Sequence, residues 1–156
     1  MKIYQEPQIC VPKFCEENGF YTTKQRSYNM SRIRGKDTKP EIRFKKALWH
    51  AGVRYRSNRW RLPGAPDISL IKYKTVVFID GSFWHGHNWD IRQTSIKSNR
   101  DFWIPKIERN MQRDREINQF YFSLGWTLFR FWDFEVQKEL GVCVKKVVDA
   151  ISSRYT

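Results

Sequence analysis

The sequence lacks the features that place a protein in or across a membrane. It has no apolar run of about 18 residues, the length that a membrane-spanning helix requires. Its first residues, MKIYQEPQICVPKF, also lack the basic and then apolar order of a secretory signal. We therefore expect a cytoplasmic protein of bacterial intracellular type with no membrane contact.

Cysteine is scarce as well, with only Cys10, Cys15 and Cys143. An odd and scattered set excludes a disulfide framework, and no second Cys/His pair completes the spacing of a structural zinc site. Internal repeats and low-complexity segments are also absent. The length of 156 residues suits one compact domain. We place that domain at residues 26–156 and treat residues 1–25 as an N-terminal arm or extension.

Acidic residues are outnumbered, with 16 Asp and Glu against 29 Lys and Arg, and the formal net charge is +13. Such a charge favours a polyanionic partner, most naturally a nucleic acid, and each phosphate contact would release a counterion. The alternative is a solvated basic surface with no specific ligand. Aromatic residues make up 16% of the chain, which serves either base stacking or an ordinary core.

The hydrophobic pattern predicts alternating helices and strands. Thr38 can cap a helix over 38–51 that has Glu41 three residues later, as in a capping box, and Gly52 beyond its end. Apolar spacing predicts a further long helix with a core stripe from Ile107 to Leu124. This long helix spans about 101–124, and the remaining elements are strands at 53–56, 67–71, 75–80 and 126–132 and a helix at 138–154. This order predicts an α/β fold, a three-layer sandwich in which helices flank a central mixed β-sheet.

Two aspartates flank the predicted strand pair. Asp67 begins one strand and Asp80 ends the next, so a hairpin would bring both carboxylates to the same edge. Mg²⁺ takes one or two protein carboxylates and keeps its other positions for water and phosphate oxygens. Both aspartates also suit ordinary turns, and Glu41 is explained by its capping position alone.

The stretch FIDGSFWHGHNWD continues from Asp80 with two histidines and two aromatic residues. A neutral His85 above the carboxylates could accept a proton from an attacking water. His87 is then a hydrogen-bonding or structural residue, although a His-x-His pair also suits zinc. Phe83 and Trp84 could wedge between base pairs or simply fill the core.

The chain resembles the very short patch repair (Vsr) mismatch endonucleases, within the PD-(D/E)xK, restriction-endonuclease-like fold. The resemblance covers about Arg26 to Trp132 and rests on RSYNMSRIRGKDTKPE, LPGAPDISL, VVFIDGSFWHGH and NRDFWIPKIERNMQRDREIN. It implies Mg²⁺-dependent nicking of one DNA strand on the 5′ side of the thymine in a T·G mismatch.

Residue roles follow from the resemblance by position. Asp67 becomes the central metal-binding carboxylate, with the main-chain carbonyl of Ile79 as a further ligand. His85 becomes the general base and Glu41 an acidic helper. Asp80 is either a direct metal ligand or an indirect partner.

The resemblance also implies how double-stranded, mismatched DNA is held. Phe83, Trp84 and Trp103 match the aromatic residues that the family inserts beside the mismatch, and Met30 matches a residue that enters from the other groove. We add Arg113, on the polar side of the long helix, as a basic DNA contact. A nucleoid-associated monomer is expected, and no protein partner can be identified from the sequence.

One departure from the family concerns zinc. Where well-known members carry three cysteines and a histidine around a structural zinc ion, this chain has Ser82, Trp89 and Phe134 and keeps only His87. We therefore predict no zinc, with the two large apolar side chains packing in place of the ion.

Two other functions fit parts of the pattern. A type II restriction-like endonuclease would use a related fold to cut intact duplex DNA. A non-catalytic DNA-binding module would explain the basic and aromatic residues, but it would gain nothing from carboxylates facing phosphates.

Overall fold

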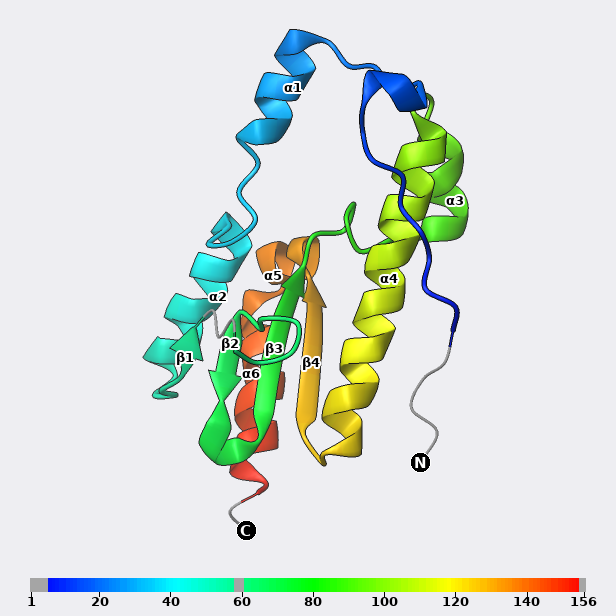
Figure 1. Cartoon of the computed structure of the whole chain (residues 1–156). Helices are drawn as coiled ribbons and strands as arrows, with labels where there is room; N and C mark the ends of the chain where they lie inside the picture. Colours follow the sequence, from blue (N-terminus) through cyan, green and yellow to red (C-terminus); the bar gives the residue numbers. More distant parts are fainter. Residues whose placement is uncertain (1–5, 58–60, 155–156) are drawn as a thin grey trace.

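A four-stranded mixed sheet forms the centre of the molecule (Figure 1). The computed structural model describes residues 6–57 and 61–154. The strands run in the order β1-β2-β3-β4, with β1, β2 and β3 antiparallel and β4 parallel to β3. They span β1 Arg56–Ser57, β2 Ile68–Leu70, β3 Thr75–Asp80 and β4 Thr127–Trp132. The predicted mixed sheet flanked by helices is confirmed.

Helices cover both faces of the sheet (Figure 1). Val77, Ile79 and Phe131 pack with α2, α5 and α6 on one face, whereas Val76 and Phe78 pack with Tyr121 of α4 on the other. No helix among the described residues is long and apolar enough to cross a membrane. The α-helices span α1 Lys24–Ser31, α2 Lys39–His50, α3 Trp89–Ser95, α4 Arg100–Ser123, α5 Asp133–Lys138 and α6 Leu140–Ser152.

Some sequence predictions of elements need correction. The strand expected at 53–56 begins only at Arg56. Leu124, predicted to belong to the core stripe of the long helix, follows the last residue of α4 and is 53% exposed. Helices α1, α3 and α5 were not predicted. Neither α1 nor α3 contains a buried residue, so neither leaves a periodic apolar signal in the sequence.

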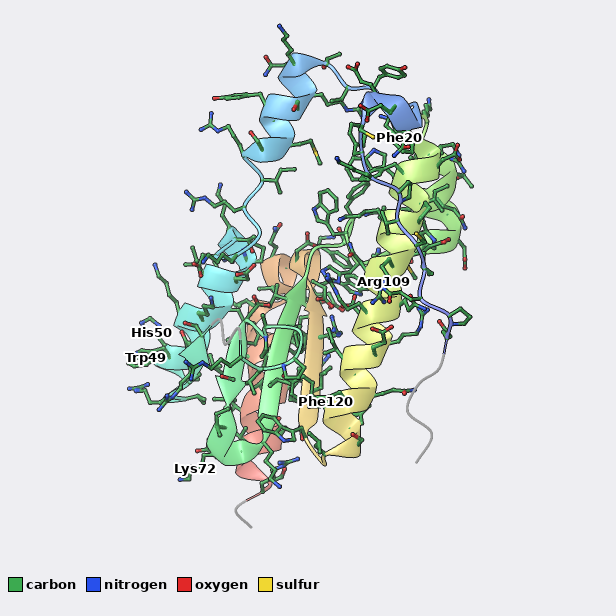
Figure 2. The ribbon with its side chains drawn as sticks, viewed as in Figure 1. Phe20, Trp49, His50, Lys72, Arg109 and Phe120 are labelled. Atoms are coloured by element: carbon green, nitrogen blue, oxygen red, sulfur yellow. The ribbon has the colours of Figure 1, made fainter. Side chains whose placement is uncertain are left out.

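The N-terminal segment lies along α4 (Figure 1). The fully buried Gln112 of α4 donates to the carbonyl of Pro7 at 2.8 Å and accepts from the amide of Ile9 at 3.0 Å. Phe20 lies beside the first turn of α4 (Figure 2), where its ring packs edge-on against that of Phe102. The described part of the expected loose arm is therefore packed against the body. Residues 1–5 of that arm lie outside the described residues, as do residues 58–60, which include the basic Arg59.

Candidate active site

Asp67 lies beside the end of β3 because β2 and β3 pair antiparallel. Its Oδ2 accepts a hydrogen bond from the amide of Ile79 at 2.7 Å. The buried Pro66 precedes it and fixes the entry into β2, while Asp67 itself stays partly exposed. The structure places the Asp67 carboxylate beside the end of β3, next to Ile79 and Asp80, as the hairpin argument predicted.

The surroundings of Asp67 disfavour its negative charge. Burial raises the pKa of Asp67 to about 7 against the lowering effect of the Ile79 hydrogen bond. The negative charges of Glu41 and Asp80 raise it further, whereas Lys45 lowers it. A divalent cation would relieve this excess of negative charge, and carboxylate oxygens are ligands that Mg²⁺ accepts. The residues present therefore fit the ion.

The raised pKa predicts a pH-dependent stability effect of Asp67→Asn in metal-free buffer. A carboxyl group whose pKa is higher in the folded state binds more protons there, so its ionisation lowers the free energy of unfolding as pH rises from about 4 to about 7. The variant should therefore melt at a higher temperature than the natural protein at pH 8, by on the order of 5 °C. The difference should shrink towards pH 4 in calorimetry with EDTA. An unchanged difference between pH 4 and pH 8 would contradict the electrostatic explanation.

Glu41 lies at the start of α2 with its side chain buried, only 4% exposed. The predicted capping box is wrong in its geometry. The Thr38 hydroxyl donates to Glu41 Oε1 at 2.8 Å instead of accepting from the helix, and Oε2 accepts from the amide of Asp37 at 2.7 Å. Glu41 thus holds the loop before α2 through two hydrogen bonds, and its negative charge helps to raise the pKa of Asp67.

Asp80 is held by an arginine that the sequence did not reveal. Nη1 of Arg130, on β4, donates to both oxygens of Asp80 at 2.9 and 2.8 Å. Burial raises the pKa of Asp80, although the positive charges of Arg130 and His85 oppose this rise. Asp80 is 6% exposed and points to the same face of the sheet as Phe78.

His85 hydrogen-bonds to Asp114 of α4, the second residue that sequence reasoning missed. Nδ1 of His85 lies 2.6 Å from Oδ2 of Asp114 and 3.7 Å from Oδ1 of Asp80. A proton on Nδ1 leaves Nε2 of the neutral ring free to accept one. Burial lowers the pKa of His85, but the hydrogen bond to Asp114 and the charges of Asp80 and Asp114 outweigh it and raise the pKa overall.

Asp80, His85 and Asp114 bring three possible metal-ligand atoms within 4.8 Å of one another. In the sequence, Asp114 stands within the run RNMQRDRE, where alternating charges indicate a solvated helix face. Only the packing of α4 over β3 and β4 brings it to His85.

His87 packs among aromatic side chains. Its ring centroid lies 4.9 Å from that of Trp132 and 4.8 Å from that of Phe134, one of the positions at which the family resemblance predicts a zinc-binding cysteine. The indole of Trp89, at another such position, donates to Glu108 at 3.2 Å. The amide of Ser82 faces Asp133 Oδ1 at 3.3 Å.

This packing motivates the prediction that the purified protein contains no structural zinc. Aromatic burial around His87 would stabilise the segment in place of a coordinated ion. Elemental analysis of protein purified without chelators should give zinc well below stoichiometry, and EDTA should leave its melting temperature unchanged. One zinc ion per chain would overturn the prediction.

The aromatic residues expected to contact DNA gather beyond β3. The ring of Trp84 lies 4.9 Å from Phe83 and 5.8 Å from Trp103. Phe83 and Trp103 line a cavity of about 620 Å³ that Met30 of α1 also lines. The structure thus brings Met30 and two of the aromatic residues, which are far apart in sequence, around one cavity.

Arg113 lies in the same hollow as His85. It is exposed on α4, donates to Asn110 at 3.4 Å, and lines a second hollow of about 660 Å³ with His85 and Asp114. Residues 61–65 also line this hollow.

The geometry of the site indicates a class of protein. A mixed sheet that presents carboxylates and an oriented histidine at one edge, in a strongly basic chain with exposed aromatic residues, is the arrangement of a nuclease.

Comparisons with known proteins agree. The profile of the family described as DNA mismatch endonuclease Vsr matches residues 18–91. The type II nicking enzyme V.HpaIIP of Haemophilus parainfluenzae is 53% identical over 67% of this chain and 74% of its own. V.NmeDIP of Neisseria meningitidis serogroup C, also named a type II nicking enzyme, is 45% identical over 85% and 90%. The DNA mismatch endonuclease Vsr of Escherichia coli K12 is 34% identical over 69% of each chain. The chain belongs to the Vsr family of DNA mismatch endonucleases, and it is a DNA endonuclease.

Proposed function

We propose that this endonuclease nicks one strand of duplex DNA at T·G mismatches, on the 5′ side of the mismatched thymine, with Mg²⁺ as cofactor. The observation that carries the proposal is the hydrogen bond between His85 Nδ1 and Asp114, which orients a histidine beside the carboxylates at the end of β3. The names of the relatives support strand nicking and mismatch recognition. The fold proposed with this function is the PD-(D/E)xK fold.

Asp67 and the main-chain carbonyl of Ile79 are the residues proposed to hold the metal ion. When bound, Mg²⁺ would polarise the phosphorus and stabilise charge on the phosphate oxygens. Glu41 acts as an acidic helper from α2, since its charge already influences Asp67. Asp80, whose oxygens are bound by Arg130, serves as an indirect partner of the reaction.

His85 is proposed to accept the proton of the attacking water at Nε2. Its Nδ1 faces Asp114, so the imidazole is held in one orientation and the positive charge that develops on it is stabilised. The raised pKa of His85 places its loss of a proton above the ordinary value of about 6.5. Nicking should therefore increase as pH rises through the neutral range.

Mismatch recognition is proposed for the aromatic cluster. Phe83, Trp84 and Trp103 would stack against bases opened at the mismatch, and Met30 would enter from the opposite groove. Arg113 would contact a phosphate near His85. The net charge of +13 supports this contact with the backbone. We propose that residues 26–156 work as one monomeric domain in the cytoplasm and bind DNA at the nucleoid.

The test is a strand-resolved cleavage assay. Duplexes with a T·G pair or the matched T·A pair, each labelled separately on both strands, would be incubated with Mg²⁺ or with EDTA. We expect one break, on the thymine strand of the T·G duplex, only with Mg²⁺. Equal cutting of both strands of matched duplex would support the type II restriction alternative. Binding without cutting under any divalent metal would support the DNA-binding module.

A further inference from the structure

Arg130 is a partly buried arginine inside the candidate active site. It lies on the face of the sheet that α4 covers, paired with Phe78 across β3 and β4, and 17% of its side chain is exposed. Its guanidinium carbon lies 4.5 Å from the centre of the Phe78 ring, and Nε donates to Asn118 Oδ1 at 2.8 Å. These contacts hold the guanidinium in one orientation.

One nitrogen of Arg130 lies against two carboxylates. Nη1 is 2.8 and 2.9 Å from the two oxygens of Asp80 and 3.2 Å from Oδ1 of Asp114. The other oxygen of Asp114 is 2.6 Å from His85 Nδ1. Each oxygen of both carboxylates therefore already has a partner.

A metal ion bound by Asp80, His85 and Asp114 would have to displace this guanidinium. A divalent ion sits about 2.0–2.2 Å from carboxylate oxygens, and here those oxygens already face a positively charged nitrogen. Two close carboxylates and an imidazole require positive charge nearby. A guanidinium supplies that charge permanently, since it does not lose its proton in the ordinary pH range.

Nη2 of Arg130 is buried and has no hydrogen-bond partner among the described residues. An unsatisfied buried donor costs stability. The unpaired Nη2 therefore indicates that the contacts of Nη1 with Asp80 and Asp114 determine where the guanidinium lies, even though its hydrogen bonds are left incomplete.

We propose that Arg130 is the permanent cation of the Asp80, His85 and Asp114 group, that it excludes a metal ion from this group, and that it holds Asp114 where it orients His85. Arg130 is then a positioning residue, and the metal ion of the reaction is confined to the Asp67 side of the site. The positioning role rests on the proposed function, whereas the exclusion of metal does not.

The first experiment counts Mn²⁺ ions bound per folded chain, without DNA, by equilibrium dialysis and electron paramagnetic resonance. Arg130→Met should bind one Mn²⁺ more than the natural protein, and adding Asp114→Asn should remove the extra ion. Arg130→Lys keeps a cation and should keep the natural count. The control is Arg109→Met, which removes another partly buried arginine of an ion pair, with Glu116, on α4 (Figure 2).

Two results would overturn the exclusion of metal. The first is a folded Arg130→Met protein with no extra Mn²⁺. The second is a protein with Asp114→Asn as its only change that binds fewer Mn²⁺ ions per chain than the natural protein. That result would mean that the Asp80, His85 and Asp114 group of the natural protein already holds an ion. This second measurement decides the question even if Arg130→Met does not fold.

The second experiment measures nicking of T·G duplex as kcat and KM. Arg130→Met should lower kcat by roughly 10- to 100-fold with little change in KM, as for residues that orient a catalytic group, and Arg130→Lys should recover part of the loss. If Arg130→Met has the same kcat as the natural protein, the positioning role is overturned. If the natural protein nicks no duplex while the Mn²⁺ counts agree, the proposed function fails and the metal exclusion stands.

Discussion

Asp67→Asn should lower the rate of Mg²⁺-dependent nicking by roughly 10³-fold or more, because the ion supplies several kcal/mol of transition-state stabilisation. Asparagine keeps an oxygen that can accept the hydrogen bond from Ile79 but loses the negative charge that binds the cation. DNA affinity in the absence of metal should stay the same or increase, since one repulsive charge is removed. Single-turnover nicking and a binding titration in EDTA measure the two effects separately.

The matched control is Asp133→Asn. Asp133 follows the end of β4, which pairs with the end of β3, and its Oδ1 accepts hydrogen bonds from the amides of Ser82 and Phe134. The change therefore removes a neighbouring negative charge and leaves the proposed metal ligands in place. Its nicking rate should stay near that of the natural protein. Equal losses in both variants would assign the effect to general electrostatics, and full activity in Asp67→Asn would remove Asp67 from the site.

His85→Ala should lower the turnover of nicking by about 10² to 10⁴-fold, the usual contribution of a general base. The remaining rate should depend less on pH, because the group whose pKa is raised by its contact with Asp114 is gone. Single-turnover rates across the neutral range, with saturating Mg²⁺, measure both properties.

Another histidine supplies the control for His85. His50 lies at the end of α2 (Figure 2). Within the described residues, its ring forms a hydrogen bond only with the carbonyl of Lys46. His50→Ala should keep the natural pH profile. If His85→Ala keeps the natural rate and profile, another group accepts the proton.

Residues close in sequence to a strong pattern could be predicted from the sequence. The β-branched run Val76, Val77 and Ile79 predicted β3 with its observed bounds, and the hairpin argument placed Asp67 beside it. The long helix was predicted within one residue at each end. These predictions succeeded because periodicity and turn residues are local properties of the chain.

Arg130 and Asp114 could not be found in this way. Arg130 interrupts the apolar run of β4, and Asp114 stands among the charges of α4, so each has the appearance of a solvated residue. They meet only because β4 pairs parallel to β3 and α4 covers the same face. Similarly, Thr38 and Glu41 match a capping box in spacing, but burial of Glu41 turned the hydroxyl towards the carboxylate.

The location of the bound metal ion in a DNA complex tests the central claim most directly. Crystals of the His85→Ala protein with a T·G duplex and Mn²⁺ would be measured at a wavelength where manganese scatters anomalously. We expect an anomalous peak within coordination distance of the Asp67 carboxylate and the Ile79 carbonyl, with the phosphate to be cleaved between that peak and the position of the missing imidazole. A peak between Asp80 and Asp114, or a DNA backbone that passes far from Asp67, would contradict the proposed mechanism.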